Sequence, residues 1–179
     1  HFGLIVWKRS RRIGLNALIE VAGIDRTRVS SYTLGFQIGP RLNAAGRMQD
    51  ATLSFELLRA TDTQTALRLA RTLNYLNQRR QQLLEQIIQE ATAQIESSGR
   101  ARQKAIVLRS PHWPKGIVGL VAGRILEKYQ RPVVVLEEAD GVLTGSARSP
   151  EKFHLIEALT RTKGYLERFG GHARAAGLT

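Results

Sequence analysis

Pro132-Val133-Val134-Val135-Leu136 is a run of branched apolar residues with the composition of a short buried β-strand. The residues that follow, Glu137-Glu138-Ala139-Asp140-Gly141, have the composition of a turn. From 142 to 147 the chain returns with the pattern of a second strand. We therefore expect two strands here, joined by a turn.

The segments on either side of these strands extend the pattern. Residues 105–108, Ala-Ile-Val-Leu, form a short apolar run of β type, and residues 117–129 carry apolar residues at helical spacing. Residues 153–159 are expected to form a further helix. The order strand, helix, strand, strand, helix within about 65 residues predicts a small α/β domain with a mixed sheet.

Hydrogen-bond donors suited to a phosphate follow these strands. Gly145-Ser146-Ala147-Arg148-Ser149 places two hydroxyls and a guanidinium after a predicted strand. Further along comes Phe169-Gly170-Gly171-His172-Ala173-Arg174-Ala175-Ala176-Gly177. We expect its two glycines to form a turn that opens a helix of small residues, with backbone N–H groups and the His172 imidazole aimed at an anionic ligand. The alternative is a plain glycine turn with a surface histidine.

Residues 62–98 form the clearest element, because apolar residues recur every three or four positions along one stripe. Thr61 to Thr63 offers capping side chains, and Gly99 ends the pattern. A helix of roughly 36 residues would be about 54 Å long, which exceeds the width of a small domain, so we expect it to connect two lobes. A coiled-coil dimer is the alternative, although Asn77 and Arg80 interrupt the stripe.

The first 60 residues have weaker patterns. Residues 2–7, Phe-Gly-Leu-Ile-Val-Trp, are expected to form a short buried strand or a packed end. Apolar residues at helical spacing predict a helix over 15–22. The alternation of Leu34, Phe36 and Ile38 predicts a half-buried extended segment.

Arg41, Asn43 and Arg47 form a polar group after Gly39-Pro40. Two guanidiniums and an amide suit a contact with a polyanion. A helix start with exposed arginines is an equally good interpretation of this segment alone.

The charge of the chain also indicates a polyanionic partner. Lys and Arg number 27 and Asp and Glu 15, a formal net charge of +12. The basic excess lies in residues 1–60 and 100–179, whereas residues 61–99 are neutral. The chain has no cysteine, which excludes disulfides, thiolate metal ligands and a cysteine nucleophile, and fits a cytoplasmic protein. No apolar run reaches the roughly 18 residues of a membrane span.

Five segments, in order along the chain, resemble the RecJ group of the DHH phosphoesterase superfamily. The members of this group are single-strand-specific exonucleases that digest DNA from the 5′ end. Residues 35–47 (Gly-Phe-Gln-Ile-Gly-Pro-Arg-Leu-Asn-Ala-Ala-Gly-Arg) resemble the segment that closes the catalytic domain. Residues 76–80 (Leu-Asn-Gln-Arg-Arg) resemble part of the interdomain helix. Residues 113–119, 145–149 and 170–172 resemble successive motifs of the DHH-associated domain.

The resemblance implies a three-part organisation. Residues 1–60 would be the C-terminal tail of a DHH catalytic domain, residues 61–99 a long connecting helix, and residues 100–179 a DHH-associated nucleic-acid-binding domain. The implied fold class is α/β, with a small mixed-sheet domain joined by the helix to the end of a preceding α/β catalytic domain.

The resemblance also implies an activity, which is 5′–3′ hydrolysis of single-stranded DNA in DNA repair and recombination. The family uses two divalent metals, usually Mn²⁺ or else Mg²⁺. The Asp-His-His triplet that names the superfamily is absent here, and the few aspartates and histidines do not cluster at metal-ligand spacing. We therefore expect the metal ligands to lie in a preceding part of a longer enzyme, and this chain alone to be inactive.

The site roles follow from the matched motifs. Ser146 and Arg148, supported by Ser149, are expected to hold the 5′-phosphate of single-stranded DNA. Gly170 and Gly171 would present His172, the one catalytic candidate, beside the scissile phosphate.

Two further contacts are expected at this site. Arg41, Asn43 and Arg47 would face the same cleft from the other lobe. Trp113 would stack on a base, although a tryptophan between two prolines is as often a packing residue.

Two other functions compete with the exonuclease. One is a relative in the same superfamily that degrades short oligoribonucleotides or cyclic dinucleotides. The other is a non-catalytic nucleic-acid-binding module, which would bind a strand without cutting it.

Overall fold

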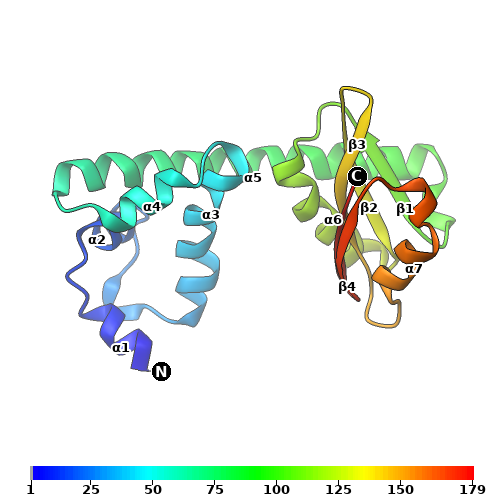
Figure 1. Ribbon diagram of the computed structural model, residues 1–179. Helices are drawn as coiled ribbons and strands as arrows, with labels where there is room; N and C mark the ends of the chain where they lie inside the picture. Colours follow the sequence, from blue (N-terminus) through cyan, green and yellow to red (C-terminus); the bar gives the residue numbers. More distant parts are fainter. Residues whose placement is uncertain (1) are drawn as a thin grey trace. The chain divides into compact units, whose positions relative to one another are not determined.

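The computed structural model describes residues 2–179, except for the side chains of Phe2 and Lys8. The chain divides into two compact units, His1–Gln82 and Leu83–Thr179 (Figure 1). The long helix α5 (Thr63–Ser97) contributes residues to both units.

The N-terminal unit is helical over its described residues. Its elements are α1 (Phe2–Lys8), α2 (Ile13–Val21), the short η1 (Arg26–Arg28), the π-helix η2 (Thr33–Ile38), α3 (Gly39–Met48), α4 (Thr52–Arg59) and the first part of α5. Leu18, Leu57 and Leu73, which come from α2, α4 and α5, are fully buried at its centre. The predicted helix over 15–22 is confirmed as α2, and Gly23 after it has a φ of +64°.

Two predictions for this unit were wrong. Residues 2–7 form helix α1 and no strand, and Val6 on it is 70% exposed. Residues 2–82 contain no strand with which an extended segment could pair. The predicted extended segment at Leu34–Ile38 lies in the π-helix η2, whose Phe36 stacks on Tyr32, the residue before the helix, with ring centroids 4.8 Å apart. Because Phe36 is 69% exposed, the alternating pattern does not mark a buried face.

Helix α5 has the predicted extent and ends. The Asp62 carboxylate accepts a hydrogen bond from the Thr65 N–H at 2.8 Å and so caps the helix, which also lowers the pKa of Asp62. Gly99, beyond the last turn, has a φ of +67°. The predicted interruption of the apolar stripe is visible at Asn77, whose side-chain oxygen accepts a 3.0 Å hydrogen bond from Arg80.

The C-terminal unit is built on a five-stranded mixed sheet, which confirms the predicted fold class. Its strands lie in the order β1 (Ile106–Ser110), β2 (Val133–Ala139), β3 (Val142–Arg148), β5 (Ala175–Leu178) and β4 (Phe169–His172). β1 and β2 are parallel, and the other neighbours are antiparallel. β4 is therefore an edge strand. The helical elements of the unit are the end of α5, η3 (Arg100–Arg102), α6 (Lys115–Tyr129), α7 (Leu155–Arg161) and η4 (Lys163–Tyr165).

Helices pack on both faces of this sheet (Figure 1). α6 packs against β2 and β3, on the face where Val133 and Val135 of β2 are fully buried. α7 packs on the opposite face, where its Leu155 joins a cluster with Ala147 of β3 and Ala176 of β5. Further along the face that carries α6, over β5 and β4, Gly170 and Gly177 are exposed.

The prediction of a helix after the Gly-Gly-His segment was wrong. Residues 169–178 form the antiparallel β4–β5 pair, with Ala173 and Arg174 at its turn. The small residues of β5 pair on both sides, with β3 and with β4, and they alternate between a buried Ala176 and an exposed Gly177. Because these four residues are mostly alanine and glycine, their alternation between buried and exposed positions gives little hydrophobic signal for a strand.

Candidate functional site

The sheet register brings the predicted phosphate-binding residues together. Residues directly opposite one another on neighbouring strands share a face, as do residues two apart on one strand. Arg148 pairs with Ala175, and Ala175 pairs with His172. Ser146 pairs with Gly177, which pairs with Gly170. These residues line a shallow pocket of about 300 Å³, together with Gly171 and Ala176.

Arg148 is held firmly at this pocket. Its Nη1 donates to the Ser146 hydroxyl oxygen at 2.7 Å and to the carbonyl oxygen of Ala147 at 2.8 Å. The Ser146 hydroxyl in turn donates to the carbonyl of Ala176 at 3.3 Å. The guanidinium is thus oriented before any ligand binds, which lowers the entropic cost of holding an oxyanion.

Gly119 of α6 makes room for this arrangement. A Cβ at this position would lie 3.3 Å from Arg148 Nη2 and 3.3 Å from Ser146 Oγ. Gly119 could not be singled out from the sequence, because its importance depends on how closely α6 approaches β3. The only signal was its place in the Trp113–Gly119 segment.

His172 lies at the exposed end of the pocket, on the edge strand. The backbone N–H of Arg174 donates to its Nδ1 at 3.3 Å. A neutral imidazole with an occupied Nδ1 acceptor carries its proton on Nε2, which can then donate to a phosphate oxygen. Gly171, one residue earlier, has a φ of +153°, and a Cβ there would lie 2.2 Å from the carbonyl oxygen of Ala175.

Ser149 and Trp113 are buried, so they differ from the predicted direct contacts. The Ser149 hydroxyl is 1% exposed and lies 3.0 Å from the Phe153 carbonyl and 2.9 Å from the Ala173 carbonyl. It ties the end of β3 to the β4–β5 turn. Trp113 is 2% exposed and its indole N–H donates to Glu90 at 2.9 Å, so its rings have no open face for a base. This placement favours the packing alternative for Trp113.

In the N-terminal unit, Arg41, Asn43 and Arg47 all lie on α3. Asn43 and Arg47 are exposed. Arg41 is half-buried, and it donates from Nε to Asn74 Oδ1 at 2.9 Å and from Nη1 to the Gln37 carbonyl at 2.7 Å. Its burial lowers the pKa of Arg41. Their expected position facing the cleft stays a prediction.

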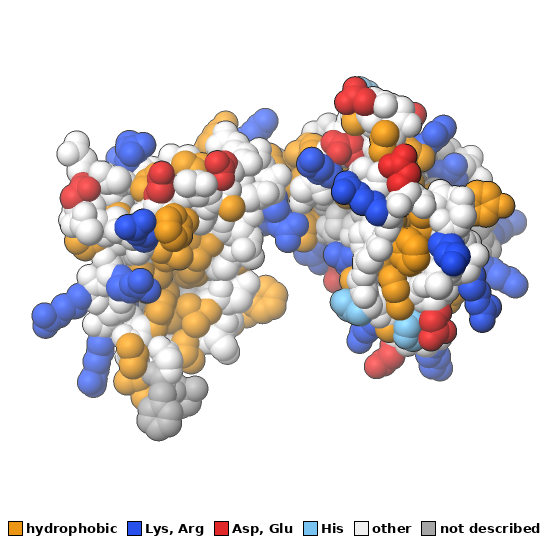
Figure 2. Space-filling view, viewed as in Figure 1, with side chains coloured by type: hydrophobic (Ala, Val, Ile, Leu, Met, Phe, Trp, Pro, Cys, Tyr) orange, Lys and Arg blue, Asp and Glu red, His pale blue; other side chains and the backbone are white. Residues whose placement is uncertain are grey.

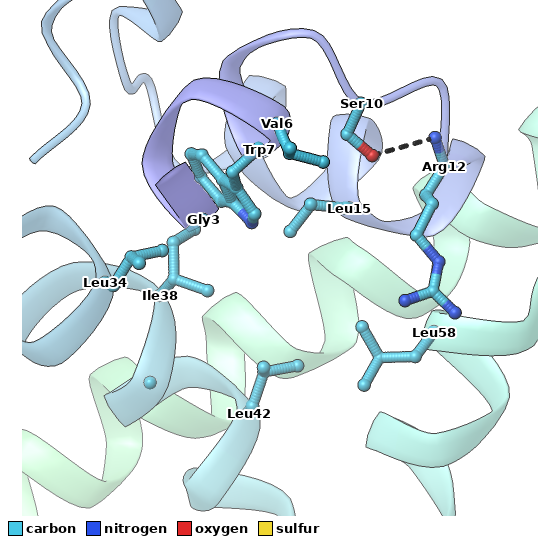
Figure 3. Close-up of a pocket in the computed structure, with 11 residues that line it drawn as sticks. Gly3, Val6, Trp7, Ser10, Arg12, Leu15, Leu34, Ile38, Leu42 and Leu58 are labelled. Atoms are coloured by element: carbon cyan, nitrogen blue, oxygen red, sulfur yellow. Dashed lines mark hydrogen bonds between the residues drawn. The ribbon is translucent and has the colours of Figure 1, made fainter. Parts of the chain in front are cut away.

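A larger pocket lies in the N-terminal unit and has a different chemistry. It measures about 570 Å³ and is lined mostly by apolar side chains, including Val6, Leu34, Ile38 and Leu42 (Figure 3). None of the predicted site residues lines it. Ser146, Arg148 and His172 line instead the smaller, polar pocket of the sheet.

The described residues do not form a metal site. Residues 2–179 contain no group of three or more His, Asp or Glu side chains that could hold a metal ion. None of the helices in this range is both long and apolar enough to cross a membrane. Lys and Arg side chains are spread over the visible surface of both units (Figure 2).

Comparisons with known proteins agree with this geometry. Residues 102–179, which hold the sheet and its pocket, match the model of the DHHA1 domain. Over nearly its whole length the chain is similar to the single-stranded-DNA-specific exonuclease RecJ. It is 39% identical to the Bacillus subtilis protein over 99% of this chain and 23% of that one. It is 38% identical to the Escherichia coli protein over 98% of this chain and 33% of that one.

Solved structures of RecJ have the same fold as this chain. The RecJ of Thermus thermophilus in complex with Mn²⁺ matches with a TM-score of 0.86 at 35% identity, over 99% of this chain and 26% of that one. A structure of exonuclease RecJ bound to manganese matches with a TM-score of 0.84 at 35% identity, over 99% of this chain and 43% of that one. The resemblance to the RecJ group is therefore confirmed. The chain spans about a quarter to a third of the length of the curated relatives it matches.

Proposed function

We propose that this chain is the part of a single-stranded-DNA-specific 5′–3′ exonuclease that holds the 5′-phosphate and the strand. The observation that carries the proposal is the common sheet face of Ser146, Arg148 and His172 beside a polar pocket. The likeness to RecJ supplies the reaction class. We place the divalent metal, Mn²⁺ or Mg²⁺, in a part of the enzyme outside these residues.

Each residue of the pocket has a separate task in this proposal. The guanidinium of Arg148 donates hydrogen bonds to two oxygens of the 5′-phosphate. A terminal phosphate is preferred because it offers more free oxygens and more charge than an internal one. Ser146 orients Arg148. His172 donates from Nε2 to an oxygen of the phosphate that is cleaved and stabilises its charge as it develops. Arg41, Asn43 and Arg47 add contacts to the strand from the N-terminal unit.

A non-catalytic nucleic-acid-binding module is the second candidate for the isolated chain. It is favoured by the lack of a metal-ligating cluster among residues 2–179. A third candidate is an enzyme that degrades oligoribonucleotides or cyclic dinucleotides. A preference for short substrates would distinguish it from the exonuclease. A role in DNA repair and recombination, in the cytoplasm, follows from the exonuclease proposal.

The first experiment compares single-stranded DNA that ends in a 5′-phosphate with the same strand ending in a 5′-hydroxyl, by fluorescence anisotropy at fixed salt. We expect the 5′-phosphate strand to bind at least about tenfold more tightly, and Arg148→Ala to abolish this ratio. Arg124→Ala is the matched control, since Arg124 is exposed and pairs with Glu127 on α6. Equal binding of both strands by the unmodified chain contradicts the proposed 5′-phosphate pocket.

A further inference from the structure

The polar face of the sheet continues one row beyond Ser146. Thr144 of β3 lies opposite Thr179, and their hydroxyl oxygens are 3.5 Å apart. Thr179 is paired with Arg168 through two backbone hydrogen bonds, of 2.8 Å and 3.3 Å. Since side chains alternate along a strand, Thr144, Thr179 and Arg168 lie on the same face as Ser146, Arg148 and His172.

Arg168 has the chemistry of a second anion contact. Its side chain is exposed, and its Nε donates to the Thr179 hydroxyl at 3.1 Å. Within residues 2–179 its two terminal nitrogens have no hydrogen-bond or ion-pair partner. A guanidinium fixed by a neighbouring hydroxyl is also the arrangement found at Arg148 and Ser146.

The space between the two arginines is open. Arg168, Thr144 and Thr179 line a pocket of about 340 Å³, which shares Gly170 and Gly177 with the pocket at Arg148. Both glycines are exposed, and a Cβ at Gly170 would meet nothing within 4 Å. A single-stranded nucleic acid that crosses Gly170 and Gly177 can therefore approach the protein backbone closely, without a side chain in its way.

We propose that Arg168, with Thr144 and Thr179, forms a second phosphate subsite that holds an internal phosphate of a single-stranded nucleic acid. Thr144 and Arg148 are four positions apart, which separates the two subsites by about 13 Å along β3. A terminal phosphate at Arg148 cannot span that distance, so the second phosphate belongs to a nucleotide further along the strand. This inference rests on the proposed function, because Arg148 fixes the position of the 5′ end.

The test is anisotropy with 5′-phosphorylated oligothymidylates of two and ten nucleotides, using the full 179-residue chain. Arg168→Ala is expected to weaken binding of the ten-nucleotide strand about tenfold at low salt. The salt dependence of log K should become shallower by about 0.7, as for one lost contact to a single strand. Binding of the dinucleotide, and the ratio between 5′-phosphate and 5′-hydroxyl ends, should stay unchanged.

Two further variants keep this test decisive. Arg161→Ala removes the same charge from α7, which packs on the other face of the sheet, and should leave the length dependence intact. Thr144→Val removes one hydroxyl at nearly constant shape, and should weaken only the longer strand. If Arg168→Ala and Arg161→Ala behave alike while the 5′-phosphate preference persists, the second subsite is wrong and the proposed function stands. If the unmodified chain shows no preference for a 5′-phosphate, the proposed function and this inference both fail.

Discussion

At the scale of single residues, Gly119 lets α6 pack close to β3 beside the pocket. Gly119→Ala would place a methyl group 3.3 Å from Arg148 Nη2 and Ser146 Oγ, which is too near for both to keep their positions. Because the guanidinium must shift by a few tenths of an ångström, we expect affinity for a 5′-phosphate strand to fall about threefold to tenfold. Anisotropy measures this, with circular dichroism to show that the fold is retained.

Gly123→Ala is the matched control for that prediction. Gly123 lies one turn further along α6, and a Cβ there would meet nothing within 4 Å. The substitution should leave binding unchanged and stabilise the helix by about 0.5–1 kcal/mol. Equal losses of affinity in the two variants would contradict the steric role given to Gly119.

Residue types drew attention to Ser146, Arg148 and His172, because guanidinium, hydroxyl and imidazole groups can hold a phosphate, but the roles given to them came from the matched motifs and stay predictions. The burial of Ser149 and Trp113 could not be predicted in the same way. It depends on the carbonyls of Phe153 and Ala173 and on the Glu90 carboxylate, which come from other elements.

At the scale of elements, the β4–β5 pair decides where His172 lies. Gly171 has a φ of +153° and no room for a Cβ, whereas Gly170 beside it has open space. Gly171→Ala is expected to destabilise the C-terminal unit by about 2–3 kcal/mol, measured by urea denaturation. Gly170→Ala should leave stability nearly unchanged and weaken strand binding, since its methyl group would stand on the floor of the pocket. A stability loss of the same size in both variants would refute this distinction.

The elements with strong hydrophobic periodicity were predicted well from the sequence. The long helix α5, helix α6 and strands β1 and β2 have apolar residues at the spacing that burial requires. β3 was predicted as the return of the chain after a turn, and Ala147 is its only buried residue. The π-helix at Thr33–Ile38 and the β4–β5 pair were missed. Neither segment has a hydrophobic pattern that reveals its structure. The π-helix exposes Phe36, and β5 consists largely of alanine and glycine.

At the scale of the whole molecule, the contacts to the strand and the ligands of the catalytic metal belong to different parts of the enzyme in our proposal. A chelator such as EDTA should therefore leave the affinity of this chain for single-stranded DNA unchanged within about twofold. Addition of Mn²⁺ should produce no cleavage, since residues 2–179 lack a metal-ligating cluster. Metal-dependent cleavage by the purified chain, followed on a 5′-labelled strand, would contradict this division of roles.

The position of β4 at the edge of the sheet gives the two sides of the pocket different local stabilities. β3, which carries Arg148, is paired on both sides, whereas β4 is paired only with β5. Edge strands open more easily than inner ones, so amides of β4 should exchange with deuterium faster than those of β3. Opening of this edge would carry His172 away from Arg148 while the inner strands stay folded. A bound strand, with its 5′-phosphate at Arg148 and its cleaved phosphate at His172, would slow that exchange, so the site should be most rigid when it is occupied.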